Sequence, residues 1–292
     1  MPVQTPAPVD YERATSVEHA LQLLERLGPD SRLIAGGHSL LPMMRIRLAQ
    51  PECVIDINDL TELDYIRVDG DDLCFGAMTR HAAVLASPVV GEHYPLFHDA
   101  ERLIADPPVR NRGTVGGSFC QADPAEDLSA VGSALKATLV LRSPQRTRTV
   151  PAREFHQGPY MTALDDAEML TEVRVPIRPG AASAYTKVKR RSGDWATAGA
   201  GAYVVLRDGV VADVGIGLTA VGAPHFCAEE AEAYLVGKPP TDEHIAEAGR
   251  LAARACNPRA DQRGPVEYKL HLADELTQRV LRTAVERAEG RS

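Results

Sequence analysis

The chain has 292 residues, of which 44% are hydrophobic and 25% are charged, and its formal net charge is −8. The length suits two domains, the composition is ordinary for a globular protein, and no stretch approaches the ~18 consecutive apolar residues of a membrane helix. The negative charge argues against a nucleic-acid partner because phosphate backbones select basic faces, and membrane contact is expected to be at most peripheral.

The N-terminal third is predicted to alternate helices and strands. Residues 1–8 have neither the basic start nor the apolar core of a signal peptide, so we expect a cytoplasmic protein. Thr15 and Glu18 form a capping box before an amphipathic helix that ends at Gly28. The elements expected next are a strand over 32–35, a helix over 40–48, a strand over 53–57, a hairpin over 66–76 and a helix over 79–87.

The pattern changes near residue 178. Before this point the sequence predicts a break at Pro107-Pro108, a helix over 129–136, and strands over 137–142 and 169–175. After it the sequence predicts strands over 184–190, 198–206 and 210–221, then helices over 228–235, 242–255 and 266–288. A β-meander followed by helices is typical of an α+β module. We therefore expect one domain over residues 1–178 and a second over 179–292.

Two glycine pairs, Gly36-Gly37 and Gly116-Gly117, carry the main functional signal. A Gly-Gly step can adopt positive φ and has no Cβ to keep a ligand away, so that consecutive N–H groups can converge on an anion. Neither pair belongs to a Walker loop or a Rossmann fingerprint, and either pair alone is more typical of a tight strand-to-helix connection. Together, 80 residues apart in the sequence, they could clasp a ligand with two phosphates, such as a dinucleotide.

Polar neighbours strengthen this interpretation. His38 adds a donor beside the first pair, although it could instead cap the following helix, and Thr114 and Ser118 place hydroxyls around the second. The acidic run over 123–127 suits ribityl or ribose hydroxyls, or alternatively caps the next helix. The basic run over 187–191 is either a solvated strand face or a contact to phosphate or to a partner. Histidines 81, 93, 98 and 156 lack a motif and are predicted to be surface or packing residues.

Three segments carry a family resemblance: AGGHSLLP over 35–42, TVGGS over 114–118 and ADPAED over 122–127. They resemble the flavin-binding motifs of the medium, FAD-binding subunits of molybdenum hydroxylases, the family of xanthine dehydrogenase and aerobic carbon monoxide dehydrogenase. The resemblance covers nearly the whole chain. Three further segments are most similar to the carbon monoxide dehydrogenase members, namely HSLLPMM over 38–44, IADP over 104–107 and KRRSGDWATA over 189–198.

The resemblance implies an α+β fold. Its first part is a PCMH-type, vanillyl-alcohol-oxidase-like FAD-binding domain with two α/β subdomains split near residue 60. A smaller βββααα domain of the carbon monoxide dehydrogenase flavoprotein type follows. Where relatives often have asparagine this chain has Ser118, which weakens one side-chain contact but leaves the backbone around it unchanged.

The resemblance also implies a set of cofactor-binding residues and no catalytic or metal-binding residue. The pyrophosphate would be held on one side, mainly by backbone, by Arg32, Leu33, Ile34, Ala35, Gly36, Gly37, His38 and Ser39, and on the other by Thr114, Gly116, Gly117 and Ser118. Gln121, Asp123 and Asp127 would bind ribityl or ribose hydroxyls, Met169 and Leu170 would lie along the flavin or adenine, and Lys187 and Asp194 would sit near the ring edge. Trp195 is either a lid over the isoalloxazine or a core residue.

The chemistry expected of this chain is that of its cofactor. Its five cysteines form no C-x-x-C pair, so zinc or iron–sulfur ligation is not predicted. By resemblance the chain holds FAD, while the molybdenum cofactor and [2Fe-2S] clusters belong to a large and a small partner subunit in a dimer of heterotrimers. Electrons would leave the flavin for a quinone or a similar acceptor. The alternatives are the same role in a hydroxylase of purines, N-heterocycles or aldehydes, and a flavin-free assembly scaffold.

Overall fold

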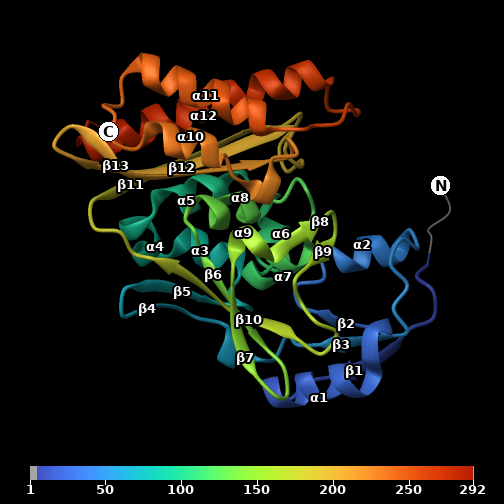
Figure 1. Ribbon diagram of the computed structural model, residues 1–292. Helices are drawn as coiled ribbons and strands as arrows, with labels where there is room; N and C mark the ends of the chain where they lie inside the picture. Colours follow the sequence, from blue (N-terminus) through green and yellow to red (C-terminus); the bar gives the residue numbers. More distant parts are fainter. Residues whose placement is uncertain (1–4, 292) are drawn as a thin grey trace.

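A computed structural model describes residues 5–291 as a stack of sheets and helices (Figure 1). In Figure 1 a helical layer at the top covers a three-stranded sheet, a middle layer of helices lies beneath that sheet, and a five-stranded sheet lies below the helices. A small N-terminal unit sits beside the lower sheet. Residues 1–4, which belong to the N-terminal segment without signal-peptide features, lie outside the described residues. No described helix is long and apolar enough to cross a membrane.

The N-terminal unit is a three-stranded parallel sheet in the order β1-β3-β2, flanked by helices. Its elements are β1 (Asp10–Arg13), α1 (Val17–Leu27), η1 (Gly28–Asp30), β2 (Ser31–Ile34), α2 (Leu40–Arg45), β3 (Cys53–Asp56) and η2 (Thr61–Leu63). The predicted Thr15–Glu18 capping box is wrong. Ser16 caps α1 by accepting from the N–H of His19 at 3.1 Å, while the Thr15 hydroxyl contacts the His19 ring instead.

The middle unit is the five-stranded antiparallel sheet, in the order β4-β5-β10-β6-β7, with helices on one face. Its strands are β4 (Ile66–Asp69), β5 (Asp72–Gly76), β6 (Thr138–Arg142), β7 (Thr147–Pro151) and β10 (Met169–Pro176). Its helices are α3 (His81–Ala86), α4 (Pro88–His93), α5 (Pro95–Leu103), α6 (Pro107–Arg110), α7 (Val115–Gln121), α8 (Asp127–Ala134) and α9 (Ala152–Phe155), and a small hairpin of β8 (His156–Gly158) and β9 (Met161–Thr162) follows.

The second glycine pair is part of a helix and not of a turn, unlike the first pair. Gly116 and Gly117 lie inside α7 and have helical backbone, whereas Gly37 has a φ of +76°. Of the four glycines, only Gly37 uses the positive φ that a Gly-Gly step allows. Thr114 caps α7, and its side chain accepts from the N–H of Gly117.

The C-terminal unit is the predicted antiparallel meander followed by helices. It consists of β11 (Ala181–Val188), β12 (Ala198–Arg207), β13 (Val210–Thr219), η3 (Pro224–Phe226), α10 (Glu229–Leu235), α11 (Asp242–Ala255) and α12 (Val266–Ala288). One face of the sheet packs on α11 and α12, and the other lies on α5 and α8. The predicted α+β fold class is confirmed.

Backbone packs directly on backbone where α8 meets β13. A Cβ on Gly215 would lie 3.0 Å from the carbonyl carbon of Ala134, and one on Gly217 would lie 2.8 Å from that of Ala130. Both distances are shorter than an ordinary carbon–carbon contact, so only glycine allows this approach. The C-terminal sheet therefore packs closely against α8, the helix that begins with Asp127.

Candidate functional site

One cleft of about 1150 Å³ opens where the three units meet. The loop from β2 to α2, the helix α7, the start of α8, the start of β10 and the segment after β11 all line it. Drug-sized ligands occupy pockets of roughly 300–1,000 Å³, so this cleft suits a larger, dinucleotide-sized molecule. Of the predicted binding residues, every one except Asp123 lines it, among them Leu33, Ile34, Thr114, Met169 and Leu170.

The first glycine segment touches the residues just before the second one in this cleft. A Cβ on Gly36 would lie 2.7 Å from the carbonyl carbon of Arg112 and 2.9 Å from the Cα of Gly113, and closer still to the Arg112 oxygen. Glycine at position 36 is therefore required by the approach of two backbone segments. The contact brings the β2–α2 loop against the entry to α7.

The β2–α2 loop presents free backbone donors to the cleft. Within residues 5–291, no protein acceptor pairs with the N–H groups of the four consecutive residues 36–39, and the first bonded N–H is that of Leu41, to the Gly37 carbonyl at 3.0 Å. Successive N–H groups in such a concave turn bind anions. His38 is exposed and lines the cleft, and no side chain caps α2. The loop thus has the donor pattern that a pyrophosphate requires.

The entry to α7 contributes differently. The N–H groups of Val115, Gly116 and Gly117 already donate to the carbonyls of Thr79 and Ala77 (both 2.9 Å) and to the Thr114 hydroxyl (3.1 Å). The helix N-terminus is therefore satisfied within the protein. On this side the cleft offers a ligand the side-chain-free surface of Gly116 and Gly117 and the hydroxyl of Ser118. The two segments form an asymmetric clasp.

A buried histidine orients that hydroxyl. His81 Nε2 lies 3.1 Å from Ser118 Oγ, and His81 Nδ1 lies 2.9 Å from Glu101 Oε1. Burial acts to lower the pKa of His81, but the Glu101 carboxylate outweighs it, and the pKa is raised. A charged His81 donates from both ring nitrogens, which leaves the hydrogen of Ser118 free to point into the cleft. His81 was expected to be a surface or packing residue, and nothing in the local sequence indicates this contact.

Asp127 and Lys187 form a buried ion pair at the cleft. Lys187 Nζ donates to Asp127 Oδ2 at 2.6 Å, and the Tyr185 hydroxyl donates to Oδ1. The Lys187 side chain is only 1% exposed. Lys187 therefore does not belong to a solvated strand face, which was one of the two interpretations of the basic run. Since Tyr185 and Lys187 come from β11 and Asp127 begins α8, the pair ties the C-terminal unit to the middle unit.

Asp123 lies outside the cleft lining, unlike the other predicted residues. Its carboxylate accepts from the Tyr160 hydroxyl at 2.9 Å and from the N–H of Ala125 at 2.8 Å. Tyr160 itself lines the cleft. The oxygens of Asp123 are directed to these two donors, so this residue holds Tyr160 in place and does not itself line the cleft.

The remaining predicted residues are distributed over opposite walls. Gln121 Nε2 contacts Met43 Sδ at 3.2 Å and so connects α7 to α2. Trp195 is 39% exposed on the cleft wall, so the alternative of a core residue is wrong. Its main-chain N–H donates to the Asp194 carboxylate. Burial acts to raise the pKa of Asp194, but this bond and the nearby arginines, including Arg263, outweigh burial and lower the pKa. Arg32, by contrast, directs its guanidinium to the carbonyls of the preceding residues 29 and 31.

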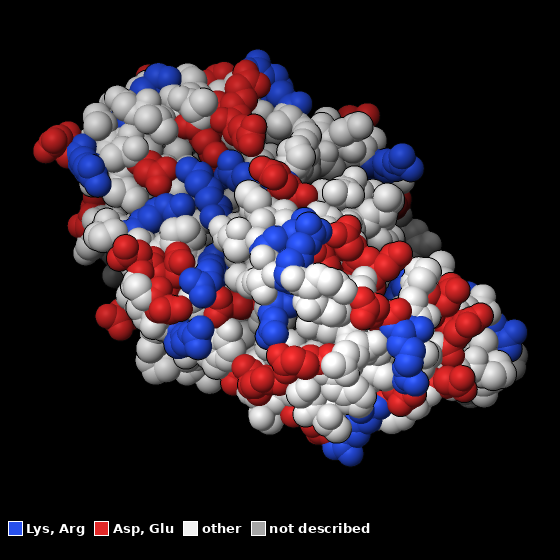
Figure 2. All heavy atoms as spheres, turned by 60° about the horizontal axis from the view of Figure 1, so that its bottom comes forward, with Lys and Arg blue, Asp and Glu red and all other residues white. Residues whose placement is uncertain are grey.

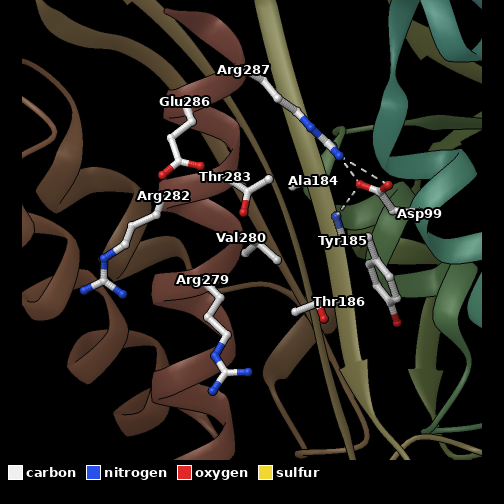
Figure 3. A pocket seen from close by; sticks show the side chains of 10 residues that line it. All are labelled: Asp99, Ala184, Tyr185, Thr186, Arg279, Val280, Arg282, Thr283, Glu286 and Arg287. Atoms are coloured by element: carbon white, nitrogen blue, oxygen red, sulfur yellow. Dashed lines mark hydrogen bonds and ion pairs between the residues drawn. The ribbon is translucent and has the colours of Figure 1, made fainter. Parts of the chain in front are cut away.

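A second, shallower depression lies between α12 and β11 (Figure 3). It measures about 430 Å³, and its charged groups are partly neutralised, because Arg287 pairs with Asp99 at 2.7 Å and Arg282 with Asp242 at 3.0 Å. It has no glycine-rich loop. On the face that Figure 2 shows, acidic and basic side chains are interspersed. The large cleft is therefore the candidate site.

Comparisons with known proteins cover nearly the whole chain. The family model described as the FAD binding domain in molybdopterin dehydrogenase matches residues 7–178, and that of the CO dehydrogenase flavoprotein C-terminal domain matches residues 183–284. The carbon monoxide dehydrogenase medium chain of Hydrogenophaga pseudoflava is 42% identical, covering 96% of this chain and 98% of that protein. The glyceraldehyde dehydrogenase medium chain of Sulfolobus acidocaldarius is 35% identical, covering 95% and 98%.

A solved structure shows the same overall arrangement. It is that of the carbon monoxide dehydrogenase from Hydrogenophaga pseudoflava that lacks the Mo-pyranopterin moiety of the molybdenum cofactor. A chain of this structure superposes with a TM-score of 0.94 at 45% identity, and the match covers 97% of this chain and 99% of that one.

Proposed function

Because this chain belongs to the family of FAD-binding oxidoreductase subunits of molybdopterin dehydrogenases, we propose that it is the FAD subunit of a molybdenum-containing carbon monoxide dehydrogenase. The observation that carries the proposal is the run of unpaired N–H groups over residues 36–39, held against the entry to α7 in a dinucleotide-sized cleft. The identity of 42% to a carbon monoxide dehydrogenase medium chain over nearly full length supports the choice of complex.

The residues present fit FAD. The free N–H groups over 36–39 would hold the pyrophosphate, and the Ser118 hydroxyl would add a donor from the other side. Asp127 would bind ribityl or ribose hydroxyls with the lone pairs that its contacts with Tyr185 and Lys187 leave free, and Lys187 would lie near the ring edge. Met169 and Leu170 supply apolar surface. When bound, FAD supplies the ability to collect electrons one at a time and to release them in pairs.

This chain's own residues would position the cofactor and exclude water. Trp195, whose main-chain N–H donates to the Asp194 side chain, would cover the isoalloxazine from the C-terminal unit. The buried pair of Asp127 and Lys187 would keep that wall in place. The other parts of the proposal are an iron–sulfur small subunit as electron donor, a molybdenum large subunit, a dimer of heterotrimers, a quinone or similar acceptor, and a cytoplasmic location.

A specific observation favours a second candidate, the same FAD role in another molybdenum hydroxylase. The glyceraldehyde dehydrogenase medium chain matches this chain at 35% identity over nearly its full length, which indicates that one medium-chain architecture accompanies different substrates. Purified complex from the native source separates the two. We expect CO-dependent reduction of a dye, whereas activity on a heterocycle or an aldehyde without CO-dependent reduction would support the second candidate.

Cofactor binding can be tested on this chain alone by a thiol footprint. Cys120 is the one cysteine among the described residues that is exposed, and it lines the cleft, although the surrounding protein raises the pKa of its thiol to about 12. We expect FAD to bind with flavin absorbance retained after gel filtration, and to slow alkylation of Cys120 in a long incubation with excess maleimide, read by mass spectrometry. A colourless chain that cannot be reconstituted, with Cys120 labelled at the same rate, would support the scaffold alternative.

A further inference from the structure

Among the described residues, Glu126 is the one buried acid of the cleft lining whose carboxyl group has no protein partner. It is 5% exposed and lines the cleft, and within residues 5–291 no donor forms a hydrogen bond with its carboxyl group. It occupies the N-cap position of α8 but makes no side-chain cap bond. The main chain around it is fixed, because its carbonyl accepts from the Thr219 hydroxyl at 2.9 Å. Its carboxyl oxygens are not among the fully enclosed unpartnered atoms of the described residues, so they are accessible from the cleft.

The neighbouring charges disfavour an ionised Glu126. Burial is the largest cause that raises its pKa, and Asp127 and Asp123 raise it further, while His81 and Lys187 oppose the shift. These opposing charges are already engaged, since Lys187 pairs with Asp127 and His81 with Glu101. The net result is a pKa of about 8. Near pH 7 the group is therefore mainly a neutral acid with an O–H to donate.

We propose that Glu126 binds the cofactor as a neutral carboxylic acid, donating its O–H to an acceptor atom of FAD that enters the cleft. This proposal rests on the proposed function, because it requires FAD in the same cleft. FAD is rich in carbonyl, hydroxyl and phosphate acceptors to which a carboxylic acid can donate. An ionised Glu126 would instead place a negative charge beside a negatively charged ligand.

The consequence is a pH-dependent affinity of a particular sign. If the complex requires the protonated acid, the Kd for FAD stays nearly constant up to about pH 7 and rises about tenfold between pH 7 and pH 9 for a pKa of about 8. His81 loses its charge with rising pH as well, so variants are needed to assign the effect. Glu126→Gln keeps the volume and a donor but cannot ionise, and Glu126→Ala removes the donor.

The experiment measures the Kd for FAD of the full-length chain, stripped of flavin, from pH 6 to pH 9 by fluorescence titration. We expect the tenfold rise in the unmodified chain and a much flatter profile for Glu126→Gln, with a Kd close to the unmodified value at pH 7. Glu126→Ala should bind about five- to tenfold more weakly at pH 7, as for one lost hydrogen bond, and with a similarly flat profile. The matched control is Asp208→Asn, which changes an exposed acid in the turn between β12 and β13, outside the cleft lining, and it should keep the full rise.

The outcomes separate this proposal from the proposed function. A chain that binds no FAD at any pH overturns both. A chain that binds FAD with a flat profile, or a Glu126→Gln variant that keeps the full rise, overturns the role of Glu126 and leaves the proposed function standing. Thermal unfolding of each variant checks that it is folded, and a destabilised Glu126→Ala leaves the test to Glu126→Gln.

Discussion

Gly36→Ala should separate the two sides of the cofactor cleft. The new methyl group would lie 2.7 Å from the carbonyl carbon of Arg112, about 0.7 Å or more inside the ~3.4 Å of an ordinary contact, and the obstacle is backbone that cannot rotate away. Overpacking of this kind costs about 1–3 kcal/mol of unfolding free energy. Because the free N–H groups over 36–39 shift with the loop, we also expect the Kd for FAD to rise at least tenfold, which corresponds to ~1.4 kcal/mol.

The assay combines denaturant unfolding with FAD titration, and Gly117→Ala is the matched control. A Cβ at position 117 would meet only the Thr114 hydroxyl, at 2.8 Å, which can rotate. The alanine gains helix propensity of up to ~1 kcal/mol while the cap bond from Thr114 loses about as much, so stability should change little. A Gly36→Ala chain with unchanged stability and unchanged affinity would refute the argument that this glycine is kept for the contact between the two segments.

Two further predictions concern charged groups. Asp127→Asn should cost about 3–5 kcal/mol of unfolding free energy because it leaves Lys187 buried without its counter-charge, and adding Lys187→Met should recover most of that loss; denaturant unfolding that shows a single variant as stable as the unmodified chain would contradict this. The hydrogen bonds from Arg148 at 2.8 and 2.5 Å are the main cause that lowers the pKa of Glu168 below its usual 4.5. A lowered acid pKa means that this stabilisation is present above pH 4.5 and is lost as the pH falls through the folded-state pKa. Arg148→Met should therefore reduce stability at pH 7 and make it less sensitive to acid below pH 4.5, whereas an unchanged difference between pH 7 and pH 3 in acid-unfolding curves would speak against the pair.

The sequence predicted those parts of the fold whose signals are local. The C-terminal meander and its helices follow from clear periodicity over long segments, and both glycine pairs line the large cleft. The short helices α4, α5 and α6 were missed because each has nine residues or fewer and begins at a proline, which by itself also marks a loop. In α7 the glycines masked a helix that Thr114 caps.

The polar interior of the site could not be predicted from sequence. His81, Glu101 and Ser118 are separated by 20 and 37 residues and meet only after the helices pack on the sheet. Glu126 was noted within an acidic run, but which acid is paired and which is left alone depends on Lys187, which arrives from β11. Asp123 illustrates the same limit, because only the fold shows that Tyr160 takes its carboxylate.

The glycine contacts between β13 and α8 bear on how such chains can evolve by recombination. Residues 7–178 and 183–284 match separate family models, so they look like exchangeable modules. Yet the carbonyls of Ala130 and Ala134 press against Gly215 and Gly217, and the same helix begins with the acid that Lys187 neutralises. A chimera that joins the first segment of one relative to the second of another must keep glycine at both sheet positions that contact α8. It must also keep both members of the buried ion pair. The two segments match separate family models, but the residues at their contact must change together.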